Sequence, residues 1–455
     1  MAISASAYLE PIYKSYYTDD KMEQLLWRND PAVRKIKKVR VTGENYKYAM
    51  LYGRGGAVSA NGATAVAAAA NTSRNVQATV PPGQLFSAFQ ITMKEILAGA
   101  NLRGAFEDPA IVNMFAASEA LRKTLASCFY GSGFGEAGKI DGAVLATATT
   151  LVLPSSAIVA IDVGTNFNVT DGSVGLPSDP VLAGGPFTVT AIDGNTVTFS
   201  PAAPVGGFSD GAWLEIADCR SGSTPLAPIG LGAILPDYFD RTGPSWASYI
   251  SDPFYGVDRS VNVDRLAGGF YKLSGSETYA NALAQGLKIA RRQGGIPDMI
   301  IVNDDDWQQI LADVYTKMNL WNTVKGADKG GSVEYQAGLS KVGIQVSTSW
   351  IDDVIDSPYC PKGTAYILET QVMKFIGLSN AETPLNDGVQ DNAAGAPPID
   401  EDGKPDMAYN LMIDDFMSIQ NQAVGQDGSA ALVLLSLFGT FVNQNPAHSC
   451  VVKFA

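Results

Sequence analysis

Residues 108–138 read DPAIVNMFAASEALRKTLASCFYGSGFGEAG. An aspartate followed by proline, as at Asp108-Pro109, is typical of a helix start, because the acid caps the first turn and proline fits it. Apolar side chains then recur at helical spacing, at Ile111, Met114, Leu121, Leu125 and Cys128. We therefore predict one long helix that ends at Tyr130 and spans on the order of 30 Å.

The glycines after this helix resemble a phosphate-binding loop only in their spacing. Gly133-Phe-Gly135-Glu-Ala-Gly138-Lys139 matches GxGxxG and nearly matches a Walker loop. Such loops follow a strand and open a helix, whereas this one follows a helix. Ile140 stands where a magnesium-binding Ser or Thr is required. We interpret the segment as a glycine-rich connector rather than a nucleotide site.

The composition argues against most catalytic and metal chemistry. The chain has 455 residues, 32 Lys+Arg, 46 Asp+Glu and a net charge of −14, which fits two to four domains. His448 is the single histidine, so a histidine-based triad or metal site would depend on it alone. Cys128, Cys219, Cys360 and Cys450 lie far apart in sequence and are interpreted as buried, reduced thiols. We expect no catalytic residue, no cofactor, no metal and no membrane segment, and hence no enzyme.

Charge changes abruptly along the chain and marks a separate module. Residues 1–139 hold 16 bases and 11 acids, whereas residues 140–219 hold eight acids and no Lys or Arg. Within that stretch, Phe187–Ile192 and Asn195–Ser200 flank Asp193-Gly194, a strong hairpin signal. We predict a small all-β domain at 140–230, inserted into a larger α+β protein.

The parts outside the module mix helices and strands. Ser274-Gly-Ser-Glu277 predicts a capping box that opens a helix. A buried strand is expected at Met299–Val302, followed by a helix around Trp307. The apolar run Ala430–Val442 is too short for a membrane span and predicts a central strand of a sheet.

One segment does not suit a compact monomer. Residues 53–84 contain no aromatic residue and no acid, and their only charges are Arg54 and Arg74. Strand-like sequences border the segment at 47–52 and 85–92. Residues 46–92 therefore predict either a long two-stranded arm that needs a neighbouring subunit or a disordered surface loop.

Three charged clusters are candidate sites. Asp304-Asp305-Asp306 lies between a strand and a helix, where capping explains the acids better than metal binding. The acidic loop 382–406 lacks the ligand spacing of a calcium loop and is interpreted as solvated surface. One basic run could face nucleic-acid phosphate or acids of another subunit, and it comprises Arg34, Lys35, Lys37, Lys38 and Arg40.

The order of these features resembles the major capsid proteins of tailed bacteriophages of the Hong Kong 97 type. Residues 7–45 are similar to the family's N-terminal arm, 52–59 and 83–94 to the two sides of its extended loop, and 108–138 to its spine helix and glycine turn. Residues 240–246 and 295–303 are similar to the re-entry into the peripheral domain and the first axial strand. Residues 140–230 are an addition to this pattern.

The resemblance implies an α+β Hong Kong 97-type capsid fold with an inserted all-β domain. The expected parts are an N-terminal arm (1–45), an extended-loop hairpin (46–92), a peripheral domain with the spine helix (93–139), the insertion (140–230), the peripheral return (231–294), and an axial domain with the C-terminal β return (295–455). Tyr52, Arg54, Arg74 and Phe86 would then contribute to the extended-loop interface between subunits.

The implied function is that of a shell protein. It would assemble with itself into hexamers and pentamers of an icosahedral head in the host cytoplasm, reside in the virion, and hold packaged double-stranded DNA without sequence preference. Scaffolding, portal and cement proteins would be separate partners. A lysine crosslink through the loop tip is not expected, since residues 53–84 contain no lysine.

Two other functions compete with this one. A carbohydrate-binding or adhesin-like surface protein could be built around the β module, and a nucleotide-dependent enzyme is a weaker third hypothesis. For the shell hypothesis, the acidic module is expected on the outer surface, because its charge would repel packaged DNA.

Overall fold

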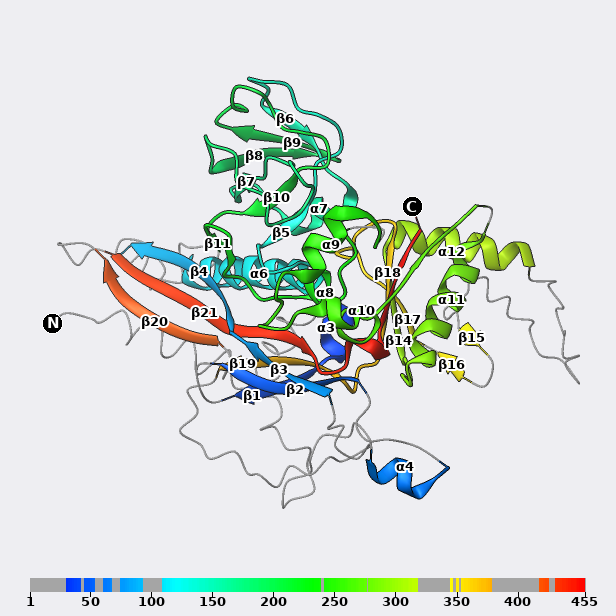
Figure 1. Cartoon of the computed structure of the whole chain (residues 1–455). Helices are drawn as coiled ribbons and strands as arrows, with labels where there is room; N and C mark the ends of the chain where they lie inside the picture. The colour runs from blue at the N-terminus through cyan, green and yellow to red at the C-terminus, as the bar shows by residue number, and fades with distance from the viewer. Residues whose placement is uncertain are drawn as a thin grey trace, which may run out of the picture.

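The structure is a computed structural model that describes residues 30–41, 45–53, 60–67, 74–92, 109–238, 241–275, 277–317, 344–346, 349–351, 353–378, 417–424 and 430–454. Most of the predicted N-terminal arm and the whole acidic loop 382–406 lie outside these residues. The described part is a mixed α+β structure with three larger sheets, as the sequence predicts (Figure 1). None of its helices is long and apolar enough to cross a membrane.

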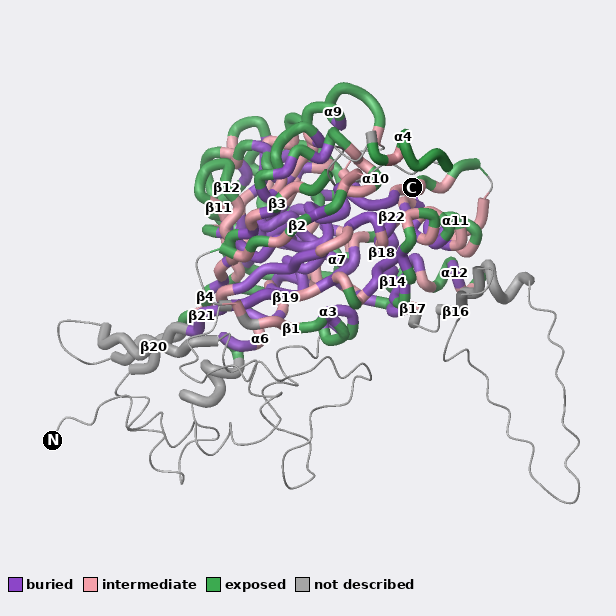
Figure 2. The backbone as a smooth tube through the Cα atoms, turned by 60° about the horizontal axis from the view of Figure 1, so that its bottom comes forward, coloured by how far each residue is buried: buried purple, intermediate pink, exposed green. Residues whose placement is uncertain are grey.

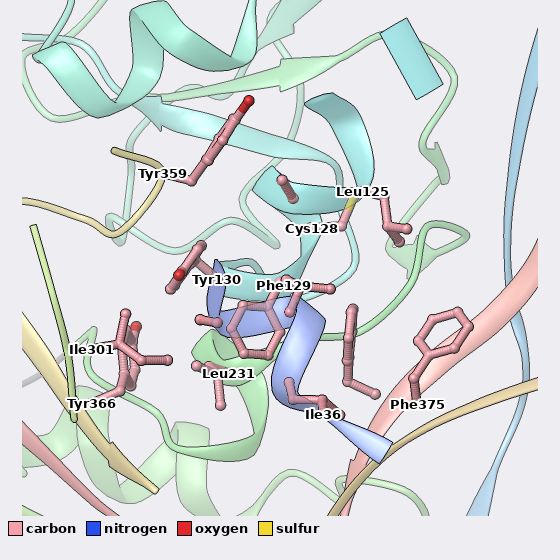
Figure 3. Packing of buried hydrophobic residues seen from close by; sticks show 14 of the residues in the cluster. Ile36, Leu125, Cys128, Phe129, Tyr130, Leu231, Ile301, Tyr359, Tyr366 and Phe375 are labelled. Atoms are coloured by element: carbon pink, nitrogen blue, oxygen red, sulfur yellow. The ribbon is translucent and has the colours of Figure 1, made fainter. Parts of the chain in front are cut away.

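The predicted long helix is present as α6, Pro109–Tyr130. It stops because the chain turns at glycines with positive φ, Gly133 at +100° and Gly135 at +71°. Leu125 and Phe129 on its last turns are buried in the main core, beside Ile36 and Phe375 from other parts of the chain (Figure 3). The helix is therefore the element around which distant segments pack.

The first large sheet combines strands from the N-terminal and C-terminal parts of the described chain. Its strands are β1 (Lys37–Val41), β4 (Gly83–Thr92), β19 (Met373–Leu378), β20 (Met417–Val424) and β21 (Ala430–Asn443). β21 pairs antiparallel with β4, β19 and β20, and β1 pairs parallel with β19. The prediction of a central strand at 430–442 is confirmed.

The second sheet has five strands in the order β13-β22-β18-β14-β17. They are β13 (Gly269–Lys272), β14 (Met299–Val302), β17 (Asp353–Asp356), β18 (Thr364–Leu368) and β22 (Cys450–Lys453). β14 lies where the sequence predicts it. The predicted boundary at residue 294 cuts across this sheet, because β13 precedes it.

Both faces of the second sheet are covered, which explains why β14 and β18 are buried at every position. Ile301 and Tyr366 face the core around α6, whereas Ile300 and Ile367 face the helices on the other side. Those helices are α11 (Tyr279–Arg292) and α12 (Asp304–Lys317).

The inserted domain is a six-stranded sheet with its own core. Its elements are β5 (Glu136–Lys139), β6 (Thr150–Val152), α7 (Ser155–Ala160), β7 (Asn166–Val169), β8 (Phe187–Asp193), β9 (Thr196–Ser200) and β10 (Trp213–Ile216). The order is β5-β10-β7-β8-β9-β6. The predicted β8–β9 hairpin is present, with Gly194 at φ +56° in its turn. The sheet starts at residue 136 rather than 140, and helix α7 was not predicted.

The chain enters and leaves this domain side by side. The amide of Gly230 donates to the carbonyl of Gly131 at 3.2 Å, and that of Ala227 to Gly133 at 3.0 Å. We expect the ends of the inserted domain, at Gly138 and Leu231, to lie close together. The two connections do lie side by side, but they meet at Gly131 and Gly133, because Gly138 is already paired with Leu214 inside the sheet. The domain stands apart at the top of Figure 1, above α6.

The remaining elements are short. They are α3 (Pro31–Lys35), β2 (Tyr46–Gly53), α4 (Gly62–Ala67), β3 (Arg74–Val80), β11 (Arg220–Ser221), β12 (Thr224–Pro225), α8 (Leu231–Ile234), α9 (Gly243–Ser251), α10 (Val263–Leu266), β15 (Ile344–Val346) and β16 (Ser349–Ile351), with single 3-10 turns at Arg259–Val261 and Pro446–His448. Figure 2 shows buried backbone in β14, β18 and β22.

Candidate assembly surfaces

The predicted hairpin at 46–92 is shorter than expected. β2 pairs antiparallel with β3, from Tyr46 opposite Val80 to Gly53 opposite Arg74. β4 leaves this hairpin and pairs with β21 instead. Pro81 and Pro82 separate the two strands, and proline cannot donate the backbone hydrogen bonds that continue a ladder. The prediction of one hairpin over the whole range 46–92 is therefore wrong.

The hairpin also packs on its own chain. Met50, Ala78 and Val80 are buried in a cluster with Tyr255 and Val442. Three hydrogen bonds add to this packing. The side-chain amide of Asn262 donates to the carbonyl of Tyr52 at 2.8 Å, and the Tyr48 hydroxyl donates to the carbonyl of Asn443 at 3.2 Å. The Thr79 amide donates to the carbonyl of Tyr255 at 3.0 Å. We expected an arm that needs a neighbouring subunit, whereas β2 and β3 pack on the body of their own chain.

The opposite face of the hairpin is open. Lys47, Ala49 and Leu51 alternate with buried or half-buried side chains and are all exposed, and Leu51 keeps 55% of its surface accessible. Their cross-strand partners Gln77 and Asn75 are also exposed and uncharged. This face carries a lysine and no acid, and we call it the outer hairpin face.

The four predicted extended-loop residues do not form one site. Tyr52 and Arg74 lie at the end of the hairpin where β2 leads into β3, Tyr52 half-buried and Arg74 exposed. Phe86 lies on β4 in the other sheet, half exposed, with its ring 5.6 Å from that of Phe438. Arg54 is outside the described residues.

A short helix lies between β2 and β3. In α4 every described side chain is exposed or half-buried, and Val66 is 76% exposed. The Asn61 side chain accepts from the Ala63 amide at 3.0 Å, which starts this helix. Figure 1 shows α4 set apart from the sheets.

The basic run covers α3 and β1. Asp30 caps α3, with its carboxylate accepting from the Ala32 amide at 2.9 Å, and burial raises the pKa of Asp30 to about 6. Val33 and Ile36 anchor the segment in the main core. The apolar side chains of this segment face the core, so its charged side chains lie on the opposite, solvent-facing side.

The five predicted bases are not equivalent. Arg34, Lys35 and Lys37 are exposed. The Lys38 ammonium donates to the carbonyls of Val33 at 3.1 Å and Arg34 at 2.8 Å, which closes the C-terminal end of α3. Arg40 continues β1, and its side chain lies outside the described part.

The sequence did not reveal a further base in this group. Lys374 on β19 is paired in register with Lys37 on β1, so the two side chains project from the same face of the sheet. Their positive charges therefore add at one place on the surface. We call the group formed by Arg34, Lys35, Lys37 and Lys374 the basic strip.

The other candidate motifs have structural roles. The glycine motif lies between α6 and β5, the reverse of the order a phosphate loop needs. Asp304–Asp306 form the first turn of α12, where Asp306 accepts from the Gly363 amide at 2.6 Å and Asp305 pairs with Lys362 at 3.2 Å. Within the described residues no group of three or more His, Cys, Asp or Glu side chains could hold a metal ion.

The four cysteines and the histidine lie in packed regions. All four cysteines are buried free thiols, and burial raises the thiol pKa of each one. His448 precedes β22 and lies against the loop after α11, with its Nδ1 atom 2.9 Å from Glu369 Oε2. Glu369 also accepts from the amide of Ile296 at 2.9 Å. The histidine and this glutamate hold together the loops at one end of the strands β14, β18 and β22.

No protein-family model matches the sequence, and no curated protein matches it. Solved structures do match. A chain of the cyanophage A-1(L) capsid asymmetric unit is 13% identical with a TM-score of 0.50, and the match covers 93% of this chain and 92% of that chain. A virus-like particle from Pyrococcus furiosus is also similar, with 9% identity and a TM-score of 0.38, and the match covers 94% of this chain and 95% of that chain. A structure of mycobacterium phage Adephagia is similar with 10% identity and a TM-score of 0.39, and the match covers 100% of this chain and 99% of that chain.

The cyanophage match extends over nearly the whole of both chains, so it concerns the complete architecture rather than one shared motif. The chain has the α+β fold of Hong Kong 97-type capsid shell proteins. The resemblance seen in the sequence is thereby confirmed at the level of the fold. The inserted six-stranded sheet is part of this chain's version of the fold.

Proposed function

We propose that this chain is the major shell protein of a tailed double-stranded DNA bacteriophage, assembling with itself into hexamers and pentamers of an icosahedral head around the genome. The observation that carries the proposal is the near full-length fold match to a chain described as part of a cyanophage capsid. We further propose that the protein is not an enzyme and that it assembles in the host cytoplasm and resides in the virion.

The surfaces described above fit this role. The outer hairpin face and the connection around α4 carry lysine and arginine but no acid, whereas the chain as a whole has a net charge of −14. A second copy of the chain is thus an electrostatically suitable neighbour for the hairpin. The basic strip would face packaged DNA or a subunit seam, with non-specific, salt-dependent contacts.

The inserted domain suits the outside of a shell. It holds eight acids and no base between residues 140 and 219, and packaged DNA would repel it. There it would be a built-in decoration or the attachment point of a separate cement protein. Scaffolding and portal proteins are proposed as further partners.

Electron microscopy of the expressed full-length chain tests the proposal, alone and with a co-expressed scaffolding protein from the same gene neighbourhood. Closed particles of megadalton mass, with the inserted domain on the outside, are expected. Small oligomers in both cases, together with binding to a glycan array, would favour the adhesin hypothesis instead. Particles with the inserted domain inside would overturn the charge argument.

A further inference from the structure

A cavity lies where the inserted domain meets the rest of the chain. It has a volume of about 200 Å³ and is bordered by α6, β5, β10, the loop before β18 and the end of β22. At roughly 30 Å³ per water molecule, it is large enough for about six waters or one small organic molecule. The cavity lies between two separate cores, those of the inserted domain and of the main body.

Two lysines from different domains approach each other at this cavity. Lys139 is on β5 of the inserted domain, with its ammonium 4.9 Å from the centre of the Trp213 ring. Lys453 is on β22 of the main body and pairs with the buried carboxylate of Asp237 at 3.2 Å. Burial and the charge of Lys453 lower the pKa of Lys139, although Asp237 opposes this effect. Both lysines line the cavity, and Asp237 is the carboxylate whose charge acts on both ammonium groups.

The remaining charged groups on the described lining do not supply a second anion for these lysines. The Glu136 carboxylate accepts from the amide of Ser132 at 2.9 Å and from its hydroxyl, and burial raises the pKa of Glu136. Lys362 at the edge pairs with Asp305 at 3.2 Å. An additional negative charge between Lys139 and Lys453 would relieve the repulsion.

The wall of the cavity also holds a hydrogen-bond donor without a partner. Tyr366 is fully buried, and among the described residues its hydroxyl has no hydrogen-bond partner. Its ring lies 6.0 Å from that of Tyr130, and both side chains are labelled in Figure 3. Tyr130 also lines the cavity. Buried hydroxyls are normally paired, so this one points to a missing acceptor. Trp213 and Tyr238, whose rings are 5.7 Å apart, complete an aromatic wall.

We propose that this cavity binds a small organic carboxylate. Its carboxylate would accept hydrogen bonds from Lys139, Lys453 and the Tyr366 hydroxyl, and its apolar body would lie against the aromatic wall. The ligand would touch both domains, and would thus fix the inserted domain to the main body. The proposal does not depend on the shell function, because the whole cavity belongs to one chain.

The test is thermal unfolding and isothermal titration of the full-length protein with benzoate. Benzyl alcohol, inorganic phosphate and sodium chloride at equal ionic strength serve as comparison probes. Benzoate is expected to raise the melting temperature saturably, whereas the other three give no saturable increase. The carboxylate assignment would be overturned if phosphate stabilised the protein saturably and benzoate did not. It would also be overturned if benzyl alcohol stabilised the protein as much as benzoate.

Three variants locate the effect. Lys139→Met removes the ammonium, Tyr366→Phe removes only the orphan hydroxyl, and each is expected to weaken benzoate binding at least tenfold. Lys123→Met is the matched control, since Lys123 joins α6 to the inserted domain through Asp162 at 2.6 Å but does not line the cavity. Unchanged benzoate affinity in both Lys139→Met and Tyr366→Phe, each folded by circular dichroism, would refute the site.

Discussion

Gly230 lies at a tight crossing, where the chain returning from the inserted domain passes the end of α6. A Cβ atom at this position would lie 2.2 Å from the carbonyl oxygens of Cys128 and Phe129, which are backbone atoms that cannot move aside. Gly230→Ala is therefore expected to lower the free energy of unfolding by ~1–3 kcal/mol through overpacking. Urea unfolding measures the change.

Gly62→Ala is the matched comparison for that variant. Gly62 opens helix α4, and a Cβ atom there meets nothing within 4 Å. Alanine in a helix is favoured over glycine by up to about 1 kcal/mol, so this variant should be neutral or slightly stabilising. Equal unfolding midpoints for Gly230→Ala and Gly62→Ala would show that the crossing is not tight.

Asp30 predicts a pH dependence with a defined sign. Burial raises its pKa from 3.8 to about 6, so the folded state keeps the proton that the unfolded state releases near pH 4. Stability from this group is present at low pH and is lost as pH rises from about 4 to about 6, by about 1.4 kcal/mol per pH unit at most. Asp30→Asn keeps an N-cap and removes the titration. The wild type should therefore lose stability relative to Asp30→Asn across this window, measured by thermal unfolding.

Asp258 provides the opposite case. It also caps a turn, accepting from the Ser260 amide at 2.9 Å, but it is exposed and the Ser260 hydrogen bonds lower its pKa. Its contribution is thus present at neutral pH and is lost as pH falls through the lowered pKa. If the stability of Asp258→Asn relative to the wild type changed with pH in the same direction as that of Asp30→Asn, burial would not explain the raised pKa of Asp30.

Among the elements, the β2–β3 hairpin separates a folding role from an assembly role. Deleting residues 55–82 would remove β3 and expose the buried cluster around Tyr255. Replacing residues 54–73 with Asn-Gly instead joins Gly53 to Arg74, which are already paired, by a two-residue turn that suits a hairpin. The free energy of unfolding of this variant is expected to lie within about 1 kcal/mol of the wild-type value. The variant is nevertheless expected to form no closed shells.

Two measurements read out this prediction. Urea unfolding reports the fold, and size-exclusion chromatography with electron microscopy reports assembly. Normal closed particles from the shortened chain would show that residues 54–73 are dispensable for the shell.

The inserted domain is expected to fold by itself. Its core is formed by residues between Ala137 and Leu214, including four phenylalanines at 167, 187, 199 and 208 whose neighbouring rings lie 5.3–5.8 Å apart. A fragment of residues 135–220 should unfold cooperatively with a dispersed NMR spectrum. The rest of the chain, with Gly131 joined to Gly230 by a short glycine linker, should keep its helix content by circular dichroism. A fragment that stays unfolded would show that the core needs the body.

Local patterns predicted the elements well where one physical cause acts alone. The buried strand at 299–302, the helix ending at Tyr130 and the Gly194 hairpin each follow from periodicity or turn chemistry. The capping box at Ser274 failed for a tertiary reason. Glu277 accepts from the Tyr271 hydroxyl at 2.6 Å, Gly275 turns with φ +62°, and α11 begins only at Tyr279.

At the scale of the whole molecule, the surfaces depend on contacts between distant residues. Lys374 belongs to the basic strip only because β1 pairs in parallel with β19, and Phe86 leaves the hairpin only because β4 pairs with β21. Neither pairing has a local signal in the sequence. The sequence therefore predicted the fold class and the inserted module, whereas the composition of the surfaces required the structure.

The basic strip gives a quantitative prediction for DNA binding. Each phosphate contact contributes about 0.9 to the slope of the logarithm of affinity against the logarithm of salt concentration. The Lys37→Gln, Lys374→Gln double variant should reduce that slope by about 2 for any duplex sequence. Lys123→Gln, outside the strip, should leave it unchanged. An identical slope in the double variant would remove the strip from the proposed DNA contacts.

The position of β22 has a consequence for how the protein is made. This strand, residues 450–453, lies between β13 and β18, so the last described strand is an interior member of its sheet. A ribosome must therefore pass residue 453 before that sheet can close. Without these residues β13 loses its neighbour in the sheet and β18 keeps only β14, so unpaired strand edges are exposed. A chain that stops before residue 450 is therefore expected to aggregate rather than to supply subunits for assembly.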